Sequence, residues 1–119
     1  IGELVDKITI LEIKKVHMST TKVKNVVKEL KLLKFILKDM NLEINLDLIN
    51  SLRKVNNSLW EIEDKIRSKE NDKNFGQEFI QLARSVYKEN DIRAAIKNEI
   101  NRNYNSDIIE EKSYKPYSS

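Results

Sequence analysis

Apolar residues recur at spacings of three and four along most of this chain, which is the period of an α-helix. Short polar stretches divide the pattern into four segments. We expect helices at about residues 3–18, from the capping residues at 19–21 to about residue 40, at 46–69 and at 75–104. Since the connections are short, the sequence predicts an all-α fold, an antiparallel bundle of about four long helices.

The helical period stops near Tyr104, and the residues that follow are polar and include the one proline, Pro116. We expect residues 1–105 to form the helical bundle domain and residues 106–119 to form an irregular, extended C-terminal tail. The second helix has an apolar stripe that suits a bundle or a dimer seam equally well, and we expect a homodimer. The residues expected in the core of the fourth helix are Phe75, Phe79, Leu82, Ala83, Val86 and Tyr87.

Charged and amide residues interrupt the apolar stripes at positions where core residues are expected. They lie on the first, third and fourth helices; the residues are Glu12, then Asn56, Glu63 and Arg67, which share their line with Trp60, and then Asn90, Arg93, Lys97 and Asn101. A buried charge is costly unless it is paired. We therefore expect Glu12 and Asn56 in a buried polar network and expect the charged groups of different helices to face one another.

Three interpretations of these residues stay open. They form a closed ion network, or the far halves of long helices present them to solvent or to a second subunit, or they frame a pocket. The two acids and three bases leave a cationic excess, which suits an anionic ligand such as a sugar phosphate or nucleotide sugar. In the pocket, Arg67, Arg93 and Lys97 hold the anion. The other candidate ligand-binding residues are Glu63 and Asn90, which orient the cations, Trp60 and Tyr87, which form walls, and Asn101.

The leading hypothesis is thus a binding or assembly module and not an enzyme. One alternative is a small helical enzyme that acts on an anionic metabolite, with Glu63 as the general acid or base. Another alternative uses the lysine stripe of the second helix, Lys24, Lys28, Lys31 and Lys38, to bind nucleic acid or an acidic surface. The net charge of +3 and the small number of arginines make nucleic acid the weaker partner.

Cysteine is absent, which excludes disulfides, thiolate catalysis and cysteine-ligated metal sites. The only histidine, His17, stands five residues after Glu12, which is not the spacing of a helical carboxylate metal site. We expect no metal and no cofactor. No apolar run reaches the roughly 20 residues of a membrane span, so we expect a cytoplasmic protein.

Four stretches of this sequence resemble a bacterial and phage family of uncharacterised small proteins, a domain of unknown function. They are GELVDKITILEIK at residues 2–14, VNNSLWEIEDKIRSKE at 55–70, FIQLARSVYKENDIRAAIKNEIN at 79–101 and EEKSY at 110–114. The resemblance covers nearly the whole chain and implies no activity. Family members often begin a few residues before the glycine, and they occur near genes for surface polysaccharide assembly, which favours a sugar-related role.

Overall fold

Four long helices form the fold in a computed structural model of the chain that describes residues 1–104, apart from the side chain of Thr20. They are α1 (Gly2–His17), α2 (Thr20–Asp39), α3 (Leu46–Asn71) and α4 (Gln77–Asn103). The described part contains no strand, and the all-α prediction with four long helices is confirmed. The predicted tail at 106–119 lies outside the described residues.

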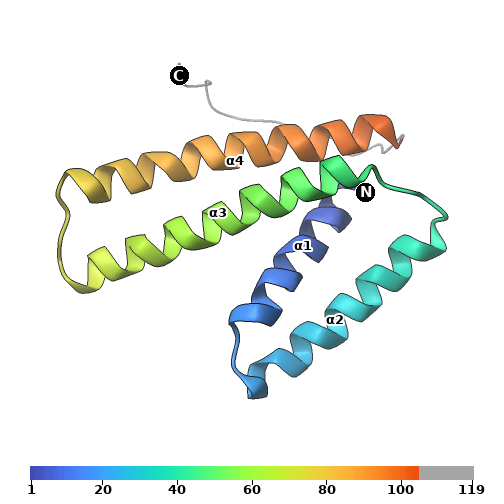
Figure 1. Cartoon of the computed structure of the whole chain (residues 1–119), viewed down its shortest axis with the longest axis horizontal. Coiled ribbons are helices and arrows are strands. Elements are labelled where there is room, and N and C mark those ends of the chain that lie inside the picture. Colours follow the sequence, from blue (N-terminus) through green and yellow to red (C-terminus); the bar gives the residue numbers. More distant parts are fainter. Residues whose placement is uncertain (105–119) are drawn as a thin grey trace.

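The helices are arranged as two antiparallel pairs (Figure 1). In one pair α3 and α4 run side by side, and in the other α2 lies against α1. The α1 helix also packs on both α3 and α4, whereas α2 packs on α1 alone among the described helices. This makes α1 the central element of the fold, and the described chain measures 49 × 41 × 23 Å along its principal axes.

The connections between helices follow from local side-chain chemistry. Asn45 is the N-cap of α3, and its side-chain oxygen accepts a hydrogen bond of 2.8 Å from the backbone N–H of Asp47. Asn41 and Lys73 have positive φ angles of 54° just beyond the ends of α2 and α3. Asparagine tolerates this left-handed conformation well, so Asn41 ends α2 as its residue type predicts.

Two apolar clusters hold the helices together, one on each side of α1. The first joins α1 to α3 and α4 and consists of Val5, Leu52, Val55 and Ile100. The second joins α1 to α2 and consists of Ile8, Leu11, Val26 and Leu30. The apolar face of α1 is wider than a single helix–helix seam, as its sequence predicts, because it packs against other helices on two sides.

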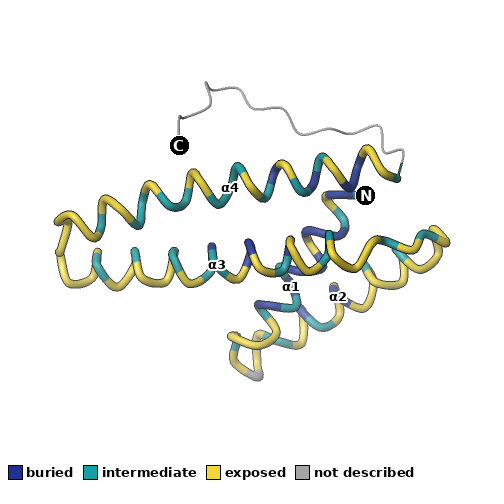
Figure 2. The backbone as a smooth tube through the Cα atoms, turned by 45° about the horizontal axis from the view of Figure 1, so that its top comes forward, coloured by how far each residue is buried: buried dark blue, intermediate teal, exposed yellow. Residues whose placement is uncertain are grey.

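The half of the α3–α4 pair that is remote from α1 protrudes, and no third helix covers it (Figure 2). Phe75 and Tyr87 are exposed there, although the sequence predicts them in the core. Phe79, Leu82 and Val86 are only partly buried. The prediction fails for Phe75 and Tyr87 because two helices alone bury one narrow seam, whereas the helical period marks a wider face.

An ion pair lies near the tip of this protruding hairpin, where Lys69 Nζ is 2.9 Å from Glu78 Oε2. The hydrogen bond and the positive charge of Lys69 lower the pKa of Glu78, and Lys65 adds a smaller effect in the same direction. The Glu78 side chain is 70% exposed, so the pair contributes little to stability.

None of the helices in residues 1–104 combines the length and the apolar character that a membrane span needs.

Candidate functional site

A buried ion network lies where α1 crosses the α3–α4 pair, and its centre is the carboxylate of Asp6. Asp6 is only 2% exposed. The Arg93 guanidinium on α4 binds both of its oxygens, with Nε 3.0 Å from Oδ1 and Nη2 in contact with Oδ2. Lys97 Nζ lies 3.9 Å from Asp6 Oδ2 and 2.6 Å from Oε1 of Glu3. Such bidentate, charge-assisted contacts are the strong form of hydrogen bonding in proteins.

Neutral polar groups complete this network. Asn56 on α3 donates from Nδ2 to Asp6 Oδ1 at 2.9 Å and to Thr9 Oγ1 at 2.8 Å. The Thr9 hydroxyl in turn donates to the backbone oxygen of Asp6 at 2.8 Å. We define the Asp6 network as the residues Glu3, Asp6, Thr9, Asn56, Arg93 and Lys97.

Charge within the Asp6 network is balanced, with two carboxylates against two cations. The sequence predicts a local cationic excess instead, because it places Arg93 and Lys97 opposite Glu63. In the structure Asp6 and Glu3 neutralise these cations, and Glu63 and Arg67 are exposed on the protruding part of α3. Arg67, Arg93 and Lys97 therefore do not converge on one anion site.

The sequence prediction misses Asp6, which is the centre of the site. Gly2, Asp6, Thr9 and Ile13 are all buried, and they follow one another at spacings of four, three and four. This is a second stripe on α1, beside the apolar stripe that contains Leu4. A small residue, an acid and a hydroxyl at core spacing are the signal that the helix meets polar partners on this side.

The remaining candidate residues are spread over several places. Trp60 is half-buried and stacks on His17, with ring centroids 5.0 Å apart and an interplanar angle of 21°. Tyr87 is exposed and Asn90 is half-buried. The Trp60 ring thus lies against His17 of α1, and the Tyr87 ring is open to solvent on α4.

Asn101 on α4 is buried against the first turn of α1. Its side-chain Oδ1 accepts a 2.7 Å hydrogen bond from the backbone N–H of Gly2. This contact requires the backbones of α1 and α4 to be very close. A Cβ atom on residue 2 would lie 2.5 Å from the carbonyl oxygen of Lys97 and 2.7 Å from Asn101 Oδ1. Glycine is required here by close packing and not by an unusual backbone angle.

We expect Gly2→Ala to lower the free energy of unfolding by about 1–3 kcal/mol, although alanine is the better helix former. The loss arises because the Lys97 carbonyl belongs to helix backbone and cannot move aside cheaply. Urea unfolding followed by circular dichroism measures it. The control is Gly76→Ala, where the nearest atom is 3.4 Å from the new Cβ and the expected cost is the smaller one of a poorer N-cap for α4. Equal effects at the two glycines would contradict the close approach of α1 to α4.

A second ion pair, between Glu12 on α1 and Arg53 on α3, lies closer to solvent than the Asp6 network. Arg53 Nε is 3.3 Å from Glu12 Oε2, and Nη2 is 3.5 Å from Oε1. Arg53 Nη1 also donates to Asn50 Oδ1 at 3.0 Å. The sequence predicts Glu12 in a buried network; in the structure Glu12 is partly buried, and its partner Arg53 does not follow from the sequence.

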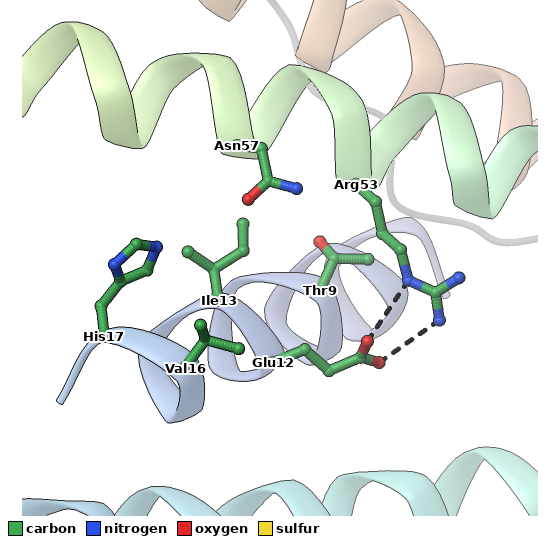
Figure 3. Close-up of a pocket in the computed structure, with 7 residues that line it drawn as sticks. All are labelled: Thr9, Glu12, Ile13, Val16, His17, Arg53 and Asn57. Atoms are coloured by element: carbon green, nitrogen blue, oxygen red, sulfur yellow. Dashed lines mark hydrogen bonds and ion pairs between the residues drawn. The ribbon is translucent and has the colours of Figure 1, made fainter.

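Two grooves meet at the Glu12–Arg53 pair. The smaller has a volume of about 210 Å³ and runs between α1 and α3 from this pair to His17 and Asn57. Figure 3 shows Arg53 reaching across from α3 to Glu12, with His17 at the other end of this groove. The walls of the smaller groove include Thr9, Ile13 and Val16.

The larger groove has a volume of about 300 Å³ and lies between α1, α2 and α3. Its charged lining residues are Lys34, Lys38, Arg53 and Glu12. Its apolar lining residues are Val5, Ile8, Leu37, Leu42 and Ile49. Three cations against one carboxylate give this groove the cationic excess that the Asp6 network lacks.

Within residues 1–104, no group of three or more histidine, aspartate or glutamate side chains is arranged to hold a metal ion. Glu63 lines neither groove, whereas Glu12 lines both.

Comparison with known proteins places the whole chain in one family. Residues 1–119 match the profile of a family described as a family of unknown function, DUF6165. This agrees with the resemblance to an uncharacterised domain that the four sequence stretches show. No curated protein and no solved structure matches the chain.

Proposed function

We propose that this chain, which belongs to the DUF6165 family of unknown function, is a binding module for a small anionic ligand held in the larger groove. The observation that carries the proposal is the lining of that groove, in which Lys34, Lys38 and Arg53 outnumber Glu12. Ligand sites are typically concave, largely apolar and equipped with a few convergent polar groups, and this groove has that composition.

The two lysines are suited to hold an anion. Lys34 and Lys38 stand one turn apart on α2, and both are exposed. Within residues 1–104 neither forms an ion pair, so a bound phosphate or carboxylate does not have to displace a protein partner. Their ammonium groups are flexible point charges that adapt to the position of the anion.

Arg53 supplies the more rigid contact. Its bonds to Glu12 and Asn50 fix the guanidinium plane and leave further N–H groups that these bonds do not use. The planar fork of an arginine matches the geometry of phosphate and carboxylate groups. Glu12 orients the arginine in this proposal, and the cations of α2 complete the site.

The Asp6 network supports the site indirectly. Through Arg93, Lys97 and Asn56, it fixes α1 on the α3–α4 pair. Its centre, Asp6, stands six residues before Glu12 on the same helix. A fixed α1 keeps Glu12 opposite Arg53. The groove has the size of a small ligand, so a sugar phosphate or a dicarboxylate fits its volume better than a whole nucleotide sugar.

A thermal-shift screen tests the proposal with inorganic phosphate, glucose 1-phosphate, UDP-glucose and succinate. A ligand present at a hundred times its dissociation constant stabilises the folded chain by about 2.7 kcal/mol, which raises the melting temperature by several degrees. We expect at least one of these anions to give such a rise. The variant Lys34→Gln/Lys38→Gln should abolish it while leaving the melting temperature of the free protein nearly unchanged, since both lysines are exposed.

The matched control is Lys24→Gln/Lys28→Gln, which removes the same charge from the same helix but from residues that do not line the groove. It should keep the ligand-induced rise. The proposal fails if no anion in the panel raises the melting temperature, or if both pairs of substitutions reduce the rise equally.

A further inference from the structure

The outer side of α2 carries an apolar patch that no described helix covers. The patch consists of Leu32, Phe35, Ile36 and Met40, and we call it the α2 patch. Leu32 is 58% exposed and Phe35 is 66% exposed. Residues 32, 36 and 40 repeat at the four-residue spacing of one helix face, and residue 35 adjoins them. The patch is exposed because α2 packs on α1 alone (Figure 2).

Positive charge surrounds this patch. The α2 helix carries six lysines and two acids, and it contains no arginine. Lys24, Lys28 and Lys31 are exposed and lie at helical spacing on the same outer side as Phe35. Of the acids, Glu29 is within 3.8 Å of Lys7 on α1 and Asp39 stands at the end of the helix. Asp39 is exposed four residues after Phe35, so the outer side of α2 is apolar and carries a net positive charge from Lys24, Lys28 and Lys31.

We propose that this side of α2 binds the surface of a bilayer that contains anionic phospholipids. A cationic amphipathic helix lies in the plane of such a surface, with its apolar side chains at the level of the acyl chains. Lysine stems extend along the apolar zone while their ammonium groups reach the lipid phosphates. Lys24, Lys28 and Lys31 beside Leu32, Phe35 and Ile36 provide both parts of this interaction on one side of the helix.

Other occupants fit this face less well. A second copy of α2 would bring lysines against lysines, and like charges at a helix seam are destabilising. Nucleic acid offers no apolar layer for the α2 patch, and α2 has no aromatic residue besides Phe35 on which bases could stack. The lipid surface is the partner that accounts for both the charge and the exposed apolar side chains.

Vesicle sedimentation tests the proposal with the full chain. We expect binding to vesicles made of equal parts of phosphatidylglycerol and phosphatidylcholine, and no binding to phosphatidylcholine alone. The variant Leu32→Ser/Phe35→Ser should lower the partition coefficient about tenfold or more, because two large apolar side chains no longer enter the interface. Lys24→Gln/Lys28→Gln should lower it about 25-fold, at about fivefold for each lysine.

Two controls separate this face from the rest of the molecule. Ile80→Ser/Tyr87→Ser changes two exposed residues on α4 and should leave vesicle binding unchanged. Lys34→Gln/Lys38→Gln removes the same charge as Lys24→Gln/Lys28→Gln but acts in the groove, and it should weaken vesicle binding less. Because all these side chains are exposed, melting temperatures should stay close to that of the parent protein, which shows that each variant is folded.

Four outcomes overturn the proposal. Equal binding to neutral and anionic vesicles, or no binding to either, contradicts recognition of anionic phospholipids. Binding that Leu32→Ser/Phe35→Ser does not change assigns the interaction to charge alone. If light scattering shows a dimer that this variant dissociates, and the dimer does not bind vesicles, the α2 patch belongs to a second copy of the chain. None of these outcomes affects the groove, which the thermal-shift experiment tests separately.

Discussion

Asp6→Asn is expected to lower the free energy of unfolding by about 3–5 kcal/mol, the usual cost of leaving buried charges without their partner. Asparagine has nearly the same shape, so the substitution removes the negative charge without opening a cavity. The charged contacts of Arg93 and Lys97 with the Asp6 carboxylate are then lost. A domain of this size has a total stability of about 5–15 kcal/mol, so the loss is a large part of it.

The electrostatic mismatch is accompanied by a conflict of hydrogen-bond donors. Asp6 Oδ1 accepts from both Arg93 Nε and Asn56 Nδ2. An asparagine amide has one oxygen, so one of its orientations would direct an NH₂ group at these donors. Equilibrium urea unfolding measures the loss, and circular dichroism at low temperature determines whether the variant still folds.

Glu63→Gln is the matched control for Asp6→Asn. It also converts an acid to its amide, but Glu63 is exposed and forms no ion pair within residues 1–104. Its effect should stay within about 0.5 kcal/mol. The double variant Asp6→Asn/Arg93→Gln adds a second measurement, because residues in one network couple by about 0.5–3 kcal/mol. An Asp6→Asn effect as small as that of Glu63→Gln would mean that the carboxylate is not part of a closed network in solution.

Leu52→Ala should lower the free energy of unfolding by about 2–5 kcal/mol. Leu52 has no exposed surface and lies in the apolar cluster with Val5, Val55 and Ile100, between α1 and the α3–α4 pair. Removal of its side chain loses the transfer free energy of the buried atoms and leaves a cavity that the surrounding helices fill only in part. The same unfolding experiment measures this loss.

The matched control is Leu46→Ala in the same helix. Leu46 is 64% exposed at the first turn of α3, so its truncation should cost far less. Similar losses for Leu52→Ala and Leu46→Ala would contradict the position of the cluster at the crossing of α1 and α3. A larger loss at Leu52 with an unchanged urea dependence shows that the core is weakened while the unfolding remains cooperative.

Helix positions follow from the sequence because helical hydrogen bonds and caps are local. The predicted segments match α1 to α4 with only small differences at the ends; α4, for example, begins at Gln77 instead of Phe75. The positive φ at Asn41 and the N-cap at Asn45 come from residues that favour these conformations by themselves. Asn56, Lys97 and Asn101 lie buried at the spacing that marks them in the sequence.

Partners across helices did not follow from the sequence. The stripe that contains Asn56, Glu63 and Arg67 looks continuous, but α1 covers only its first part, so Asn56 is buried while Glu63 and Arg67 are exposed. The cations of α4 pair with Asp6 and Glu3 on α1, not with Glu63 on α3.

By itself, therefore, the sequence determined the four helices, their approximate ends and the side of each helix that is apolar, because these depend on contacts within a few residues along the chain. Only the tertiary structure decided which part of each apolar side is covered by another helix. It placed α1 across one half of the α3–α4 pair, which buried Asp6 with Arg93 and set Glu12 opposite Arg53. It also left the outer side of α2 uncovered. A helical period carries no information about where another helix crosses it, and that crossing fixes which charges are neutralised and which remain available to a partner.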